Sequence, residues 1–244
     1  MAIEIGNDVR FATQAADLVW YGVSVVNGEP AEEGNRGEKP GAANHNSLKE
    51  AIVQAAIELG TELGEEGLTM RGIAARLGVS ATALYQHFEG KASILRAIRF
   101  HGLALMNRSV APAFDHTDPL DQIRESALAY INFARSNPWL YSLLFGGDLV
   151  DYDSLTDEER EVLLYPQVKV QSAFQVGKEQ GKLRVDIDVA TSPFLLWASN
   201  HGLAMLLITG RVSEQHPNFP VPSVEEFIRS FVQSEMRGLT PCES

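Results

Sequence analysis

Apolar residues recur along most of this chain at the three- and four-residue spacing of an amphipathic helix. The first clear run covers residues 48–63, and Ser47 with Glu50 forms a capping-box pattern at its start. A helix is therefore predicted to begin at Ser47 and to end near residues 63–67. No segment alternates apolar and polar positions between turn residues, as a half-buried strand would. The pattern predicts an all-α protein.

Two short helices are expected to follow. Thr69 is placed to cap the first of them, and Gly78 to end it. Ser80 is placed to cap the second, which is expected to run to Phe88, and a fourth helix is predicted from Lys91. The three residues that join the two short helices allow the sharp turn of a helix-turn-helix unit, which is a DNA-binding motif.

Five further helices are predicted in the second half of the chain. Their expected ranges are residues 119–136, 139–145, 157–180, 188–209 and 224–237. Asp118, Thr156 and Ser223 have side chains suited to cap three of these helices. Pro166 falls inside the 157–180 helix and is expected to kink or split it, because proline lacks the backbone N–H.

The chain divides into three regions. Residues 1–46 form an N-terminal extension, with an apolar helix or strand at residues 11–26 and a flexible linker rich in Gly, Glu, Asn and Pro at residues 27–46. Residues 47–101 form the predicted DNA-binding domain, and residues 102–240 a larger helical domain. The extension carries no recognisable function.

Charge is distributed unevenly over these regions. The 244 residues have a formal net charge of −12, which by itself disfavours binding to a polyanion. Residues 67–101, however, hold five basic residues and one acidic residue, whereas residues 47–66 hold one and five. Any contact with DNA is therefore expected within residues 67–101.

Composition also limits the location of the protein. The single cysteine, Cys242, excludes an intrachain disulfide framework and suits a reducing compartment. No secretory signal opens the chain, and the most apolar stretch, residues 193–210, is interrupted by three polar residues. We expect a cytoplasmic protein without a membrane span.

The region from residue 48 to residue 98 resembles the TetR family of bacterial transcriptional regulators. The resemblance rests on the apolar spacing of residues 52–59, the Gly67-Leu68-Thr69 turn, the run Ile73-Ala74-Ala75-Arg76-Leu77-Gly78-Val79-Ser80, and Ala83-Leu84-Tyr85-Gln86-His87-Phe88 with Lys91 three residues later. It implies a three-helix DNA-binding head joined to a larger helical bundle for ligand binding and dimerisation.

The same resemblance assigns DNA contacts. The family's base-reading positions fall on Ala81, Thr82, Ala83 and Gln86, and its phosphate contacts fall on Thr69, Arg71, Tyr85, His87 and Lys91. Glutamine can pair bidentately with adenine, and small side chains allow a helix N-terminus to enter the major groove. Alternatively, Tyr85 and Phe88 close the core of the head, and His87 caps the end of its helix.

A second resemblance lies in the larger domain. Tyr130-Ile131-Asn132-Phe133-Ala134, Asn137-Pro138-Trp139-Leu140-Tyr141, and Trp197, His201 and Gly202 are similar to the C-terminal domain type named WHG for its Trp, His and Gly. We expect a mostly apolar small-molecule effector to bind in a pocket lined by Trp139, Trp197, Asn200 and His201. The alternative is that Trp197 simply packs over a hydrogen-bonded His201.

The last predicted helix carries a wide apolar stripe. Its members Val224, Phe227, Ile228 and Phe231 are expected to form a homodimer interface together with the apolar 188–209 helix, as the TetR resemblance implies. The alternative is that this stripe packs on its own domain. A two-fold dimer would place two heads at the fixed spacing that a palindromic DNA operator requires.

The motifs of common enzymes are absent from the sequence. There is no nucleophile elbow, phosphate-binding loop, dinucleotide fingerprint or paired metal-binding histidine motif, so no catalytic residue, cofactor or metal is expected. The acidic residues at 148–161 lack the spacing of a calcium loop. We predict a ligand-responsive repressor that a small molecule releases from DNA. The alternative is a helical small-molecule binding protein with little affinity for DNA.

Overall fold

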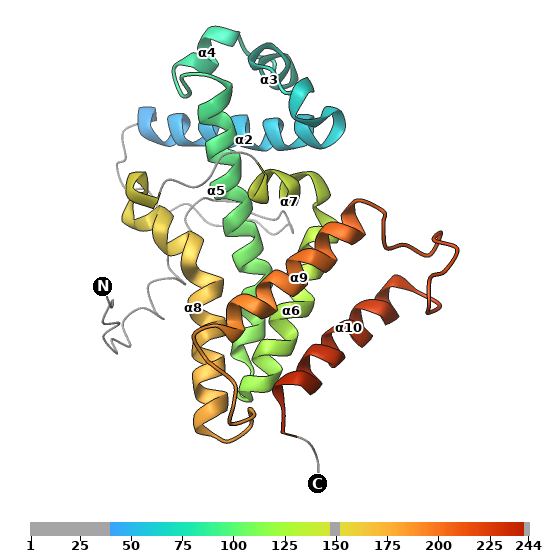
Figure 1. Ribbon diagram of the computed structural model, residues 1–244. Helices are drawn as coiled ribbons and strands as arrows, with labels where there is room; N and C mark the ends of the chain where they lie inside the picture. The colour runs from blue at the N-terminus through green and yellow to red at the C-terminus, as the bar shows by residue number, and fades with distance from the viewer. Residues whose placement is uncertain (1–39, 147–151, 242–244) are drawn as a thin grey trace, which may run out of the picture.

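The computed structural model describes residues 40–146 and 152–241, which contain helices and no strand (Figure 1). The α-helices are α2 (Pro40–Gly67), α3 (Met70–Leu77), α4 (Ala81–Tyr85), α5 (Lys91–Val110), α6 (Pro119–Ser136), α7 (Pro138–Phe145), α8 (Asp157–Glu179), α9 (Ser192–Ile208) and α10 (Val224–Leu239). Two short 3₁₀ helices, η1 (Ala111–Asp115) and η2 (Tyr152–Ser154), connect them. The all-α prediction is confirmed.

The first helix begins earlier than predicted. Helix α2 starts at Pro40, so Ser47 lies inside the helix and does not begin it. Residues 40–46 are correspondingly helical and not part of a linker. Proline is favoured in the first turn of a helix because its φ is already helical and its missing N–H needs no partner there. At the other end, Gly64 has φ 73° and interrupts the helix within the predicted 63–67 range.

Several predicted boundaries agree with the structure. Asp118 accepts a hydrogen bond from the Leu120 amide, and Thr156 and Glu159 form a reciprocal capping box. Ser223 accepts from the Glu226 amide at the start of α10. Local side-chain chemistry fixed these helix starts, because each cap satisfies an amide that has no partner within the helix.

Helix α8 runs through Pro166 as one helix, so of the two predicted outcomes, a kink or a split, the split does not occur. Proline leaves the carbonyl four residues earlier, that of Val162, without its helical donor. The Asn107 side chain of α5 donates to this carbonyl, with an Nδ2–O distance of 2.7 Å. A neighbouring helix thus supplies the missing hydrogen bond.

One hydrophobic core runs from the end that holds α3 and α4 into the larger domain. It includes Ile52, Leu68 and Leu84 at one end, and Ile131 and Val232 at the other. Helix α5 leads from the first end into the bundle, where α6 packs against α5, α8, α9 and α10 (Figure 1). Helices α3 and α4 therefore stand at one extremity of the molecule.

Some predicted segments lie outside the described residues. They are the apolar segment at 11–26, the part of the predicted linker at 27–39, and residues 148–151 of the acidic stretch at 148–161. Among the described helices, none combines the length and apolarity needed to cross a membrane.

Candidate nucleic-acid interface

Helices α3 and α4 form a helix-turn-helix with the predicted caps. Thr69 Oγ1 accepts from the Gly72 amide at 3.0 Å, and Ser80 Oγ accepts from the Ala83 amide at 3.2 Å. Gly78 ends α3 with φ 68° and ψ 26°, a left-handed conformation that disfavours residues with a Cβ. The turn between the helices is therefore specified by glycine and by two hydroxyl caps.

Helix α4 is held from beneath by the core of the head. Leu84 is fully buried and Phe88 is 5% exposed, so Phe88 is a core residue, whereas Tyr85 is 56% exposed. The alternative that Tyr85 closes the core is thus excluded for this conformation. The helix ends at Tyr85 and does not reach Phe88, because Gln86 and His87 already form a turn. It presents one short face outward at the end of the molecule (Figure 1).

The nine predicted DNA contacts share one property, which is that none of them is buried. Thr69, Arg71, Thr82, Tyr85 and Gln86 are exposed, and Ala81, Ala83, His87 and Lys91 are partly exposed. The N-terminal turn of α4 offers only small side chains, Ala81, Thr82 and Ala83. A narrow helix end of this kind can approach base edges closely.

The positive charge of this region is largely committed to internal contacts. Arg76 pairs with Glu58 and Glu62 of α2, Arg96 binds both carboxylate oxygens of Glu159, and the Arg99 Nε donates to the Leu143 carbonyl. The pairing with Arg76 holds the pKa of Glu62 below its usual value. Less of the positive charge of residues 67–101 is therefore available for DNA than the count of basic residues suggests.

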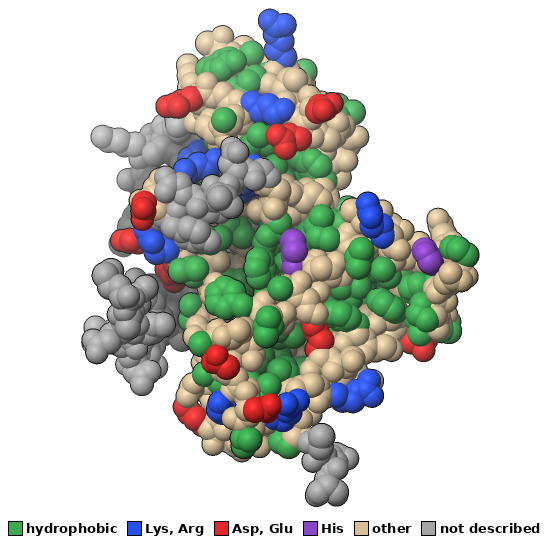
Figure 2. All heavy atoms as spheres, in the orientation of Figure 1, with side chains coloured by type: hydrophobic (Ala, Val, Ile, Leu, Met, Phe, Trp, Pro, Cys, Tyr) green, Lys and Arg blue, Asp and Glu red, His purple; other side chains and the backbone are tan. Residues whose placement is uncertain are grey.

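The other two cations of residues 67–101, Lys91 and Arg71, differ in their contacts. Lys91 donates through Nζ to the Glu65 carbonyl at the end of α2, so it joins α2 to α5. Within the described part of the chain, Arg71 forms no hydrogen bond or ion pair. Acidic and basic side chains alternate over the head in Figure 2. This mixed surface favours short-range contacts over long-range attraction to DNA.

Trp197 and His201 of the larger domain belong to a compact hydrogen-bonded cluster. Trp197 Nε1 donates to the Tyr130 hydroxyl at 3.1 Å, and the Tyr141 hydroxyl donates to that of Tyr130 at 2.8 Å. His201 Nδ1 lies 2.7 Å from the Tyr141 hydroxyl. Burial raises the pKa of Tyr130 to about 12 and lowers the pKa of His201, so both side chains are neutral at pH 7.

The four predicted ligand residues are not brought together. Asn200 is buried, with its Nδ2 donating to the Leu196 carbonyl and its Oδ1 without a partner among the described residues. Trp139 instead lines a cleft of about 490 Å³ between α2, α5 and the corner that joins α6 to α7. The side chains of Trp197, Asn200 and His201 do not line that cleft. The contacts of Trp197 and His201 therefore fit the alternative, in which Trp197 packs over a hydrogen-bonded His201, better than a ligand pocket shared with Trp139.

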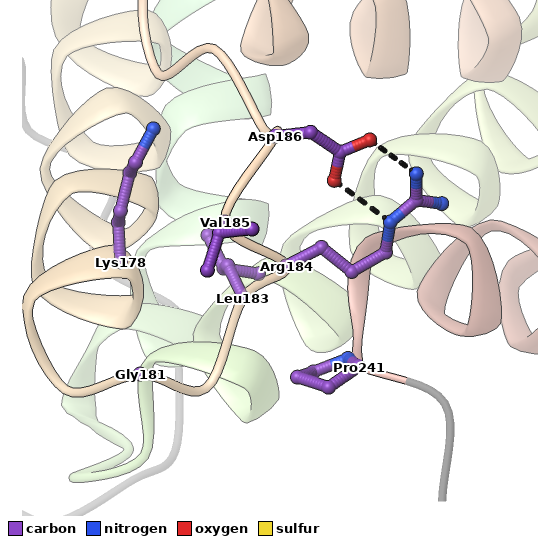
Figure 3. Close-up of a pocket in the computed structure, with 7 residues that line it drawn as sticks. All are labelled: Lys178, Gly181, Leu183, Arg184, Val185, Asp186 and Pro241. Atoms are coloured by element: carbon purple, nitrogen blue, oxygen red, sulfur yellow. Dashed lines mark hydrogen bonds and ion pairs between the residues drawn. The ribbon is translucent and has the colours of Figure 1, made fainter.

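A second cleft of about 430 Å³ lies at the opposite end from α3 and α4 (Figure 3). Arg184 and Lys178 line it, but Arg184 pairs with Asp186 and Lys178 donates to the Ile187 carbonyl. Both cations therefore already have partners, and we assign no ligand to this cleft.

Helix α9 leaves several large apolar side chains exposed. Phe194, Leu195, Trp197 and Leu206 are 51%, 64%, 47% and 43% exposed. Of the predicted interface residues on α10, Val224, Phe227 and Phe231 are partly exposed, but Ile228 is only 3% exposed and packs inside its own chain. Hydrophobic side chains gather over this α9–α10 side in Figure 2.

Comparison with known proteins supports the interpretation of the helix-turn-helix. The family described as "Bacterial regulatory proteins, tetR family" matches residues 52–98, and the family "Tetracyclin repressor-like, C-terminal domain" matches residues 123–231. A nucleoid occlusion factor, SlmA, from Sodalis glossinidius is 32% identical over 139 residues, which cover 56% of this chain and 68% of that protein.

The chain belongs to the TetR family. It is a DNA-binding transcriptional regulator with a helix-turn-helix head. The class C tetracycline repressor of Escherichia coli is 40% identical over 67 residues, but this match spans only 28% of the chain and 31% of that repressor. The TetR family regulator PfmR of Thermus thermophilus has a solved structure with a TM-score of 0.55 and 25% identity, covering 78% of this chain and 99% of PfmR.

Sequence reasoning missed two features of this TetR-family chain. The sequence pattern marks Tyr130 and Tyr141 only as parts of a resemblance, yet their hydroxyls bridge Trp197 to His201. Trp139 lies so close to Gly60 of α2 that a Cβ there would be 2.1 Å from a ring carbon. A glycine inside a predicted helix was the only signal for this close approach.

Proposed function

We propose that the protein is a ligand-responsive repressor that binds a palindromic operator as a homodimer. The observation that carries the proposal is the position of α4 at the extremity of the head, where its small N-terminal residues and Gln86, which directly follows the helix, are accessible to solvent. Ala81, Thr82, Ala83 and Gln86 would contact base edges in the major groove, and Thr69, Arg71, Tyr85, His87 and Lys91 would contact phosphates. We propose no catalytic role.

The dimer interface is proposed to lie on α9 and α10. Leu195, Ser199, Gly202 and Leu206 are exposed at successive turns of α9, and a Cβ placed on Gly202 would meet no atom within 4 Å. Because the two leucines flank the small residues Ser199 and Gly202, a helix of a second subunit could pack closely against α9. Val224, Phe227 and Phe231 of α10 would extend this surface, while Ile228 would support it from inside.

The response to ligand is proposed to be a two-state shift. A small molecule that binds better when the two heads are wrongly spaced lowers the affinity for DNA by linkage. We further propose that the C-terminal domain is of the WHG type. Trp197, His201 and Gly202 support this assignment, because the first two both contact the Tyr130 hydroxyl and the third leaves the proposed dimer side open.

The experiment that tests the proposal is the selection of operator DNA from random duplexes, followed by binding at several salt concentrations. We expect a palindromic site and an affinity that falls linearly with salt on logarithmic axes. The alternative function, a small-molecule binding protein with little DNA affinity, is favoured by the net charge of −12 and the internal pairing of Arg76 and Arg96. Failure to enrich any duplex at low salt would decide for this alternative.

A further inference from the structure

The 490 Å³ cleft beside Trp139 is formed by two parts of the molecule that a regulator must couple. Ile57 and Thr61 come from α2 of the head, His101 and Arg108 from α5, and Trp139 from the start of α7. Its volume lies within the range of ordinary small-molecule sites. A molecule seated in it would touch the head and the larger domain at once.

The cleft has both apolar and charged walls. Ile57 and the Trp139 ring supply apolar surface, whereas Arg108 is an exposed cation. Within residues 40–146 and 152–241, no carboxylate pairs with Arg108. His101 is half-buried, and burial together with the charge of Arg108 lowers its pKa, so the imidazole is a neutral donor and acceptor at pH 7. One end of the cleft is thus suited to an anion and the rest to an apolar body.

Close backbone contacts connect this cleft to the position of the head. The Trp139 ring lies directly against Gly60 of α2, and Leu140 lies against Gly102 of α5, where a Cβ would be 2.8 Å from its Cδ1. Helix α7 is therefore held between α2 and α5 at two glycines. The Trp139 ring is already in direct contact with the backbone at Gly60. Any movement of Trp139 that a ligand causes must therefore also shift α2.

We propose that this cleft binds a small organic monoanion with an aromatic body, its carboxylate at Arg108 and its ring beside Trp139. The bound molecule holds α2 against α7, restricts the movement of the head and lowers the affinity for operator DNA. The effect on DNA rests on the function proposed above, but the binding itself does not.

The test is isothermal calorimetry on the full chain with 2-naphthoate, and with neutral 2-naphthamide as the matched control ligand. We expect one site per chain, with binding at least about tenfold weaker for 2-naphthamide and for Arg108→Gln. Arg124→Gln removes an exposed arginine of α6 that pairs with Asp121 and does not line the cleft, so it should bind naphthoate normally. Thr61→Trp, which fills the cleft from an exposed position, should abolish binding.

Two outcomes overturn the anion site. They are the absence of binding heat at millimolar naphthoate, and equal affinities of the Arg108→Gln and Arg124→Gln variants. If naphthoate binds but leaves the operator affinity within twofold, the coupling to the head is overturned. If no DNA is bound with or without naphthoate, the proposed function fails, while the calorimetric result still decides the site.

Discussion

At the scale of single residues, the surface of α4 separates side chains that can read DNA from those that support the fold. Leu84 and Phe88 are buried, while Thr82, Tyr85 and Gln86 are exposed on the same short segment. This division follows from helical geometry, since residues that point into the core cannot also reach a groove. It makes Gln86 the most informative position to change.

Gln86→Ala is expected to relax sequence preference at one base step, with a cost of about 1–3 kcal/mol for the preferred base. The reason is that a glutamine amide can pair bidentately with adenine, whereas alanine cannot. The measurement is the affinity for a set of operator variants at one salt concentration. Gln175→Ala, an exposed site on α8, is the matched control. An equal loss of affinity for all variants would assign Gln86 to a non-specific contact.

Glu235 of α10 is a second informative residue because its Oε2 is buried without a partner among the described residues. Burial raises the pKa of this carboxyl, partly offset by a hydrogen bond with Ser199. The folded state therefore holds the proton more tightly than the unfolded state, and stability falls as pH rises from the unfolded pKa through the folded pKa.

Glu235→Gln should accordingly raise the melting temperature at pH 7, and the gain should shrink as the pH falls through the folded pKa and vanish below the unfolded pKa. Solvent reaches part of the side chain, so we expect a gain of less than about 1 kcal/mol, which corresponds to a rise of at most about 2–4 °C. Thermal denaturation between pH 4 and pH 8 measures this. A loss of stability at pH 7 would mean that the carboxylate is ionised and paired in the assembled protein.

At the scale of elements, α8 persists through Pro166 because α5 compensates for the missing hydrogen bond. Asn107→Ala should cost about 1–3 kcal/mol, since it leaves the Val162 carbonyl unsatisfied. In a Pro166→Ala background the same change should cost less, because residue 166 then supplies its own N–H to that carbonyl. The double-mutant cycle, measured by urea denaturation, should give a coupling of about 1 kcal/mol.

The control for this cycle is Asn107→Ala combined with the distant Gln175→Ala, which should be additive. Additivity of Asn107→Ala with Pro166→Ala would instead show that Asn107 does not replace the lost helical bond. The result matters for function because α5 leads directly into the head and α8 holds it through Arg96 and Glu159.

At the scale of the whole molecule, the apolar side of α9 has no cover within the described part of the chain. Leu195→Glu with Leu206→Glu should yield folded monomers, because both leucines are exposed and their loss removes little from the core. Sedimentation velocity measures the change, and circular dichroism checks the fold. Operator affinity should fall strongly, since one head then binds without its partner.

Val185→Glu is the matched control, because this residue is 92% exposed but lies in the loop before α9. A Leu195→Glu, Leu206→Glu protein that still sediments as a dimer would place the interface elsewhere. Changing Phe227 and Phe231 to glutamate would not separate the effect on the dimer from the effect on the fold. Phe227 packs against Phe219 with ring centroids 5.5 Å apart, so its loss would also disturb the chain itself.

The sequence by itself determined the all-α class, most helix boundaries and the helix-turn-helix. Caps such as Thr69 and Ser80 and the left-handed Gly78 act over three or four residues, so their effect can be read locally. The tertiary structure alone decided which charges stay available, how α8 passes Pro166, and where Trp139 and Trp197 lie. These outcomes depend on contacts between residues far apart in the chain, and a single sequence carries no direct signal for such contacts.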